Sequence, residues 1–220
     1  MITLCTAAKG GSGCTLVASL GALRSPGPVL VVDLAGDVPA MLGVDEPDRP
    51  GVVDWLASGA PGDHLDDLVL DVAPERWVLP ATSGPRRPTE LPSDPERWEE
   101  LLGVLERWAH DTGCSVTVDA GTLPLPGALV RGSDHRWLVT RACYLALRRA
   151  ARAPGSPTGV VLVEEPGRAL GWRDVEASLG VPVVAVVGWS PRIARAVDAG
   201  LLRCGRLPSD LDRAVAALAS

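Results

Sequence analysis

One segment near the start of the chain restricts the possible folds more than any other. Residues 2–7 form a short apolar run, and residues 8–15 (AKGGSGCT) follow it as a glycine-rich turn. A helix is predicted to begin near Thr15 and to continue through Leu23. Glycines in such a turn let successive backbone N–H groups point inward, and the helix dipole adds a positive potential. This arrangement predicts an anion-binding loop between a strand and a helix.

Apolar runs and amphipathic segments alternate along the rest of the chain. Strands are predicted at residues 29–33, 77–81, 116–119, 137–140, 159–163 and 181–187. Helices are predicted at residues 52–58, 95–111, 142–151, 172–179, 191–199 and 209–218. Continuous apolar runs are typical of parallel strands that are buried on both faces. We therefore expect an α/β fold with one domain over residues 1–220, in which helices cover both faces of a mostly parallel sheet and ligands bind outside the carboxyl ends of its strands.

The composition argues against several classes of protein. With 21 Lys and Arg against 27 Asp and Glu, the net charge of −6 disfavours a general electrostatic attraction to nucleic acid or anionic lipid. No apolar run approaches the roughly 20 residues of a membrane-spanning helix, and the N-terminus lacks the basic flank of a signal peptide. The 5 cysteines include no CxxC pair, so neither a disulfide framework nor a zinc site is indicated. We expect a cytoplasmic protein with reduced thiols.

The glycine-rich turn departs from the ordinary P-loop at one position. The ordinary pattern ends in Gly-Lys-Ser/Thr, in which the lysine contacts the β- and γ-phosphates and the hydroxyl contacts Mg²⁺. Gly13 and Thr15 match this pattern, whereas Cys14 occupies the position of the lysine. The single lysine of the chain is Lys9, near the start of the same turn. The turn therefore has the pattern of a phosphate loop without its usual cation.

In this turn the sequence resembles the deviant Walker A ATPases of the ParA/MinD family, whose loop reads Lys-Gly-Gly-x-Gly-Lys-Ser/Thr. Lys9 matches the first, "signature" lysine of that pattern. Asp33 and the segment through residues 41–43 resemble the family's switch I region, and residues 119–121 (DAG) resemble its Walker B and switch II segment. The resemblance implies a nucleotide site made of Lys9, Gly10, Gly11, Ser12, Gly13, Cys14 and Thr15, and a Mg²⁺ site made of Thr15, Asp33 and Asp119.

Two departures from the family pattern predict weak catalysis. Family members usually carry Asp-x-Asp in switch I, and the second acid helps to position the attacking water. Ala35 stands at that position here, and Asp37 lies two residues out of register. A water-positioning group typically contributes ~10²–10⁴-fold in rate, and the missing lysine is worth roughly 1.5–3 kcal/mol, or about 10- to 150-fold in phosphate affinity. We expect a pseudo-ATPase without a catalytic residue, which binds ATP or ADP with Mg²⁺ weakly or not at all.

The resemblance leaves three functions open. Loss of loop residues is common in the branch that resembles TadZ/CpaE, the localisation factors of Tad-type pilus systems. The first hypothesis is therefore a non-catalytic positioning protein that is recruited to a pole or a membrane complex. The second is a slow ATPase of chromosome or cargo partitioning that binds nonspecific DNA, and the third is a scaffold that binds no nucleotide.

The resemblance also implies an oligomer. Family members sandwich nucleotide between two subunits, and the signature lysine reaches across to the partner's phosphates. This implies a homodimer, or a heterodimer with a ParA/MinD-like paralogue whose site Lys9 completes. A protein partner in a localisation or secretion system is expected in either case.

Several site residues have a structural interpretation beside the functional one. Lys9 is either a ligand or a solvated loop residue, and its position and uniqueness favour a ligand. Cys14 is either a redox-sensitive thiol activated by the helix N-terminus or the simple loss of a lysine, and we favour the loss. Asp33 and Asp119 are either caps of the following turns or Mg²⁺ ligands, and the neighbouring loop favours Mg²⁺.

Two further groups of residues bear on partners. A set of arginines is a candidate DNA-binding stripe, made of Arg141, Arg148, Arg149 and Arg152. However, arginines in the last turn of a helix ordinarily interact with its dipole and with water, and the negative net charge also argues against DNA binding. The tryptophans mostly sit at apolar positions and are expected in the core. Trp55, in the helix predicted at residues 52–58, is the candidate for an exposed interface anchor.

Overall fold

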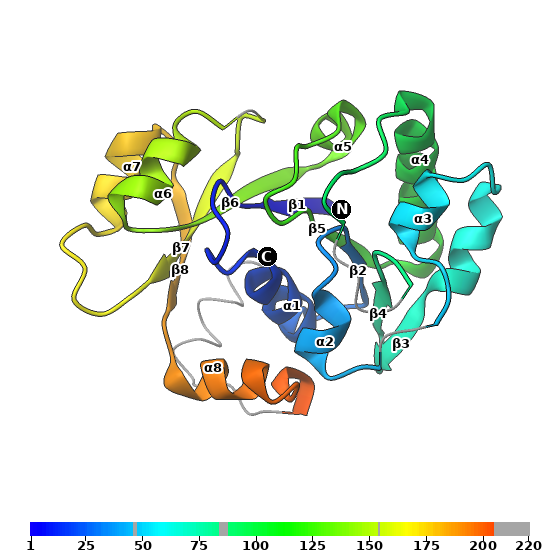
Figure 1. The fold of residues 1–220 in the computed structure, drawn as a ribbon, viewed down its shortest axis with the longest axis horizontal. Coiled ribbons are helices and arrows are strands. Elements are labelled where there is room, and N and C mark those ends of the chain that lie inside the picture. The colour runs from blue at the N-terminus through cyan, green and yellow to red at the C-terminus, as the bar shows by residue number, and fades with distance from the viewer. Residues whose placement is uncertain (46–47, 84–87, 154, 205–220) are drawn as a thin grey trace.

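The fold is built on a sheet in which the strands of one edge pair are antiparallel and all other neighbours are parallel. The computed structural model describes residues 1–45, 48–83, 88–153 and 155–204. Its strand order is β3-β4-β2-β5-β1-β6-β7-β8, and β3–β4 is the antiparallel pair (Figure 1). The strands are β1 (Ile2–Thr6), β2 (Val29–Asp33), β3 (Leu70–Ala73), β4 (Arg76–Leu79), β5 (Ser115–Asp119), β6 (His135–Arg141), β7 (Gly159–Glu164) and β8 (Val183–Gly188). Because β1 lies between β5 and β6, the loop that follows it stands at the centre of the sheet.

Helices cover both faces of the sheet. The helices below the sheet in Figure 1, which share one core with it, are α1 (Cys14–Arg24), α2 (Val38–Leu42) and α8 (Pro191–Asp198). The opposite face carries two separate cores. The larger lies under α3 (Val52–Leu56), α4 (Pro95–Thr112) and α5 (Gly127–Gly132), and the smaller under α6 (Tyr144–Ala150) and α7 (Trp172–Leu179). Short 3₁₀ turns occur at Gly62–Leu68 and Leu202–Cys204. Within the described ranges, none of the helices combines the length and apolarity needed to cross a bilayer.

The predicted α/β class is confirmed, and the predicted strands are present with small shifts at their ends. The sequence analysis did not predict α2, β3 or α5. Each of these elements has only four to six residues, which is too few for a hydrophobic period to emerge. The helix predicted at residues 209–218 lies outside the described residues.

The long helix α4 follows its sequence signals closely. The Oδ1 atom of Asp94 accepts the backbone N–H of Glu96 at 3.0 Å, and Pro95 occupies the first turn. Gly113 ends the helix with φ +67°, in the left-handed region that glycine tolerates best. Asp94 and Pro95 fix where α4 begins, and they thereby place Arg97 in its first turn.

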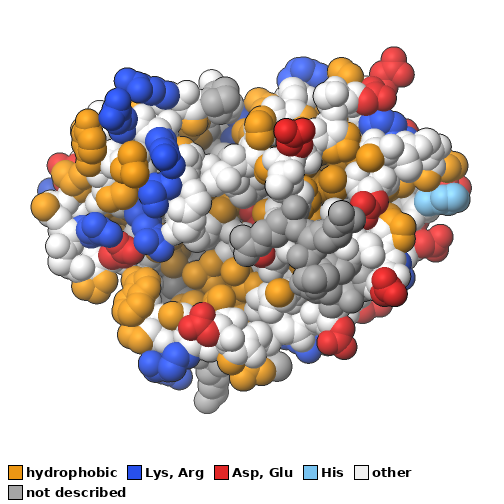
Figure 2. All heavy atoms as spheres, in the orientation of Figure 1, with side chains coloured by type: hydrophobic (Ala, Val, Ile, Leu, Met, Phe, Trp, Pro, Cys, Tyr) orange, Lys and Arg blue, Asp and Glu red, His pale blue; other side chains and the backbone are white. Residues whose placement is uncertain are grey.

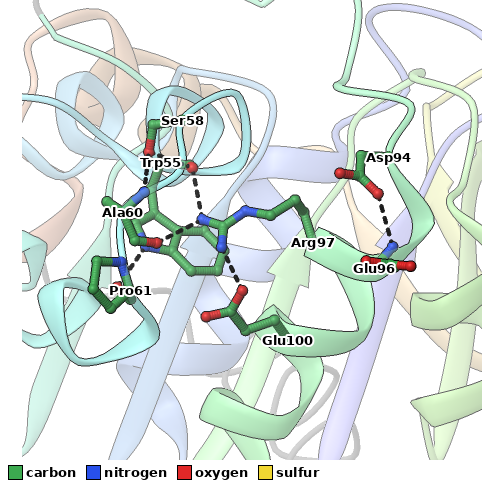
Figure 3. Close-up of polar contacts among 8 residues, drawn as sticks. All are labelled: Trp55, Ser58, Ala60, Pro61, Asp94, Glu96, Arg97 and Glu100. Atoms are coloured by element: carbon green, nitrogen blue, oxygen red, sulfur yellow. Dashed lines mark hydrogen bonds and ion pairs between the residues drawn. The ribbon is translucent and has the colours of Figure 1, made fainter.

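Trp55 is buried, so the prediction of an exposed interface anchor is wrong. Its side chain is 2% exposed, and its Nε1 donates to the carbonyl oxygen of Pro61 at 3.0 Å. The guanidinium of Arg97 lies 3.7 Å from the centre of the indole ring, and its Nη2 donates to the carbonyl oxygens of Trp55 and Ala60 at 2.9 and 3.0 Å (Figure 3). An arginine of α4 therefore covers this tryptophan. The tryptophans that are exposed are Trp172 and Trp189.

A glycine contact joins α2 to the segment that follows α8. Gly43 ends α2 with φ +66°, and a Cβ atom there would lie 1.7 Å from the carbonyl oxygen of Gly200. We expect Gly43→Ala to lower the free energy of unfolding by about 2–4 kcal/mol, the sum of a left-handed alanine and a forced displacement of packed backbone. Urea denaturation of the two proteins measures this difference.

Gly113→Ala is the matched control for this prediction. Gly113 also ends a helix with a positive φ, but a Cβ atom there would have no neighbour within 4 Å. Gly113→Ala should therefore lower the free energy of unfolding only by the cost of a left-handed alanine, about 1 kcal/mol. Equal losses in the two variants would mean that the segment after α8 is not packed against α2 as described.

Candidate functional site

The turn after β1 is shaped as an anion-binding loop. Gly13 precedes α1 with φ +94°, a left-handed conformation that favours glycine. The Oγ of Ser12 donates to the carbonyl oxygen of Lys9 at 2.7 Å, which closes the turn. The backbone N–H groups of Gly13, Cys14 and Thr15 have no acceptor among the described residues. They are therefore available to an anion at the N-terminus of α1.

The residues predicted for the nucleotide site line a single cavity. It has a volume of about 400 Å³, and its lining includes Lys9, Gly10, Gly11, Ser12, Gly13, Cys14 and Thr15. Ala35 and Asp37 enter the lining from the segment that resembles switch I, and Gly121 enters it from the segment that resembles switch II. The sequence analysis missed five further lining residues, which are Ala7, Leu16, Pro88, Thr122 and Leu123. Thr122 and Leu123 directly follow the DAG segment, and this position in the sequence could have identified them as lining residues.

Cys14 is buried, and its thiol stays protonated. Its side chain is 6% exposed and belongs to the core around α1. Burial raises the pKa of Cys14 well above its usual value, and the negative charge of Asp119 raises it further. A thiol in this environment is not the activated thiolate of a redox centre. The position of the missing lysine is therefore filled by a neutral, unreactive side chain.

Asp33 and Asp119 lie side by side at the carboxyl ends of β2 and β5. Asp33 is fully buried, and it accepts the backbone N–H groups of Ala35, Gly36 and Val38 at 2.9, 2.7 and 3.0 Å. Burial raises the pKa of Asp33 to about 7, the charge of Asp119 adds to the rise, and the three N–H groups oppose it. Both oxygen atoms of Asp33 thus hold the turn that leads into α2, as the capping interpretation predicts.

Asp119 has an oxygen atom suited to a cation. Its Oδ1 accepts the N–H of Gly121 at 3.1 Å, whereas its buried Oδ2 has no hydrogen-bond partner among the described residues. Burial raises the pKa of Asp119, the side chains of Thr15 and Cys14 oppose the rise, and the charge of Asp37 adds to it. An orphaned carboxylate oxygen beside a threonine hydroxyl fits a hydrated Mg²⁺ that also contacts phosphate.

The protein does not supply a complete metal site at this position. Among the described residues, no group of three His, Cys, Asp or Glu side chains is arranged to hold a metal ion. A Mg²⁺ held by Thr15 and Asp119 would therefore depend on oxygen atoms of the nucleotide. Asp37, which the sequence analysis set aside because of its register, lines the cavity next to Ala35.

Lys9 lies in the lining of the cavity, near an ion-pair cluster. Its Nζ donates to the carbonyl oxygen of Gly10 at 3.3 Å. Glu165 forms ion pairs with Arg168 and with Arg141 (2.8 Å); these arginines hold its pKa below the usual value, and Lys9 contributes to the effect. Arg141 is therefore engaged by Glu165. The remaining members of the predicted DNA stripe are exposed, namely Arg148, Arg149 and Arg152.

Several solved structures share the fold of this protein over nearly the whole length of the chain. A ParA family ATPase from Chlorobium tepidum is 18% identical, with 99% of this chain and 98% of that chain covered and a TM-score of 0.74. The cell division ATPase MinD from Pyrococcus furiosus is 22% identical, with 99% and 96% covered and a TM-score of 0.74. An ATP complex of a McdA variant from Cyanothece is 17% identical, with 99% and 96% covered and a TM-score of 0.69.

Comparison by sequence adds no relative to these structures. No protein-family model matches the chain, and no curated protein matches it. Identities of 17–22% over the full length establish a shared fold rather than a shared activity. The chain therefore has the P-loop α/β fold of the ParA and MinD ATPases.

Proposed function

We propose that the chain is a ParA/MinD-like positioning protein that binds Mg²⁺–ATP or Mg²⁺–ADP weakly, hydrolyses ATP little and acts by dimerising and binding a protein partner. One observation carries this proposal. The glycine-rich loop places a left-handed Gly13 directly before α1, while the position expected for its chief cation holds the buried, neutral Cys14. Structural similarity to a McdA–ATP complex supports an adenine nucleotide as the ligand.

The proposed site recognises phosphate through backbone groups more than through side chains. Three N–H groups at the start of α1 have no acceptor in the described part of the chain, and they can bind an anion without any change of side-chain conformation. Thr15 and Asp119 would hold Mg²⁺, which when bound supplies positive charge next to the phosphates. Without the loop lysine, we expect affinity to be about 10- to 150-fold lower than in a complete loop. Ala35 lines the cavity at the position where the family's water-positioning carboxylate is expected, so hydrolysis is proposed to be slow.

Dimerisation is supported by the placement of Lys9. This lysine lines the cavity, and the only hydrogen bond of its Nζ within the described residues is to the adjacent Gly10. Its ammonium group is therefore free to turn towards phosphates held by a second copy or by a competent paralogue. We further propose that the partner belongs to a localisation system of the Tad pilus type, at a cell pole or membrane complex, because loss of loop residues is characteristic of that branch.

Calorimetric titration with Mg²⁺–ATP and Mg²⁺–ADP tests the nucleotide part of the proposal. We expect weak, saturable binding that Thr15→Val abolishes, because the hydroxyl beside Asp119 is lost. Thr122→Val is the matched control, since Thr122 lines the same cavity but is not among the residues proposed to hold phosphate or Mg²⁺, and it should leave binding unchanged. Phosphate release is expected to be slow, and DNA is not expected to accelerate it.

Two outcomes would reverse this conclusion. The absence of any binding to either nucleotide would favour the nucleotide-free scaffold. Fast Mg²⁺-dependent turnover that is stimulated by DNA and lost in Thr15→Val would favour the partition ATPase. A Lys9→Ala variant that leaves a paralogue's ATPase rate unchanged in a mixed assay would remove the heterodimer.

A further inference from the structure

A second cavity lies beside the phosphate loop, and no part of the proposed function uses it. Its volume is about 300 Å³, at the lower end of the range for small-molecule pockets. It is bounded by the segment after β5, by the amino half of β6 and by the end of α6. Its apolar wall includes Leu123, Leu125, Leu138 and Ala153, and its charged residues are Arg136 and Arg149.

The charge of this cavity is entirely positive. Among the described residues, its lining contains two arginines and no acidic residue. Arg136 donates from Nε and Nη1 to the carbonyl oxygens of Ser156 and Ser133 at 3.1 and 3.4 Å, which orients its guanidinium without neutralising it. Arg149 is exposed on α6, and within the described residues neither arginine forms an ion pair.

The surrounding surface has the same sign, although the whole chain is acidic. From residue 135 to residue 163 the sequence contains arginines at positions 136, 141, 148, 149 and 152 and no acidic residue, and of these arginines Arg141 is paired with Glu165. Figure 2 shows Lys and Arg side chains gathered on the left of the molecule, over α6 and α7 as placed in Figure 1. A cavity in this region therefore attracts anions from solution.

The cavity lies where neither of the two cores on this face of the sheet includes the side chain of Leu138. Leu138 of β6 is 3% exposed, yet it belongs neither to the core under α3, α4 and α5 nor to the core under α6 and α7. Leu138 is instead part of the cavity wall. An apolar group that enters the cavity would therefore pack against Leu138, which neither core includes, and against Leu125, which borders the larger core.

The cavity shares its inner wall with the nucleotide site. Ala7, Thr122 and Leu123 line both cavities. The backbone N–H of Ala7 donates to the carbonyl oxygen of Gly121 at 2.6 Å, which links the phosphate loop to the segment after β5. A molecule bound in the second cavity would therefore contact both segments at this shared wall.

We propose that this cavity binds a small carboxylate with an apolar body. The carboxylate lies between Arg149, whose planar fork matches its geometry, and the Nη2 of Arg136, and the apolar body lies against Leu123, Leu125 and Leu138. Because Ala7, Thr122 and Leu123 form the shared wall, the bound molecule restricts the phosphate loop. This site does not depend on nucleotide binding by the loop.

Octanoate is the probe, and its titration into ¹⁵N-labelled full-length protein is followed in ¹H–¹⁵N spectra. We expect saturable shifts of the amide peaks of Thr6, Ala7, Ala8, Thr122, Leu123 and Leu125, while octanol of the same chain length produces none of them. Arg149→Gln should weaken octanoate binding about tenfold, which is the loss of one charge-assisted hydrogen bond at a partly open site. Arg148→Gln is the matched control, since Arg148 is the preceding residue of α6 but does not line the cavity; it should change affinity less than about twofold.

Three results would overturn the proposal. Octanoate shifts that gather away from the cavity would place the binding elsewhere. Equal losses in Arg148→Gln and Arg149→Gln would reduce the effect to general surface charge. Binding of octanol as tight as that of octanoate would show that the arginines are not part of the site.

Discussion

Replacing Cys14 with lysine is expected to raise the affinity for Mg²⁺–ATP by about 10- to 150-fold, the equivalent of a charge-assisted hydrogen bond worth roughly 1.5–3 kcal/mol. Cys14 lines the cavity formed by the glycine-rich loop, and the backbone N–H groups that we propose to bind phosphate lie at the start of the same helix. The variant therefore adds a cation to a preformed site. Titration calorimetry on the original protein and on the variant, at one salt concentration, measures the ratio.

The interior beside Cys14 can accept a positive charge. Asp119 lies close enough for its charge to raise the pKa of the Cys14 thiol, and its buried Oδ2 has no hydrogen-bond partner among the described residues. The negative charge of that carboxylate would attract a nearby ammonium group, which offsets part of the cost of placing a cation beside the core. The ammonium group would also favour the ionised form of Asp119 and so oppose the rise in its pKa that burial causes.

Cys14→Met separates charge from volume in this experiment. Methionine has nearly the length of lysine and no charge, so it should leave nucleotide affinity close to that of the original protein. An equal gain in the methionine and lysine variants, or no gain with lysine, would show that a missing cation does not limit binding.

Turnover is a second readout of the same variant. Cys14→Lys is expected to hydrolyse ATP slowly, since Ala35 still supplies no carboxylate to the cavity. If Cys14→Lys proves fast, Asp37 is the acid to examine, because it lines the same cavity. Adding Asp37→Asn to Cys14→Lys then tests that role.

The centre of this fold was predictable because its signals are local in the sequence. The continuous apolar run at residues 29–33 needs no distant contact to indicate a buried parallel strand, and its predicted bounds match β2. The glycine-rich turn likewise carries its own conformation, as the positive φ of Gly13 shows. The seven residues predicted to form the loop line one cavity for the same reason.

The features that escaped prediction depend on residues far apart in the sequence. Trp55 lies in a short apolar segment whose exposure is decided by Arg97, 42 positions later. On α4, Arg97 follows the pattern of an ordinary polar position, and nothing local reveals that two carbonyl groups of another segment face it. β3 is a four-residue edge strand that is recognisable only through its pairing with β4. The second cavity similarly combines segments that are joined only in the folded chain.

Arg97→Met is expected to lower the free energy of unfolding by about 3 kcal/mol, because several polar contacts are lost together. The Arg97 side chain is 14% exposed, and its guanidinium group binds two carbonyl oxygens, lies over the ring of Trp55 and forms an ion pair with Glu100. Methionine preserves most of the volume but leaves the carbonyl groups of Trp55 and Ala60 without their donor. For a domain with a total stability of about 5–15 kcal/mol, this is a large loss.

Arg107→Met on the same helix is the matched control, because Arg107 is exposed and should change the free energy of unfolding by less than about 0.5 kcal/mol. Arg97→Lys keeps the charge but not the planar fork, so it should fall between the two methionine variants. Urea denaturation of all three variants gives the order directly. If Arg97→Met costs no more than Arg107→Met, the arginine does not hold α3 against α4. The burial of Trp55 must then come from the apolar core alone.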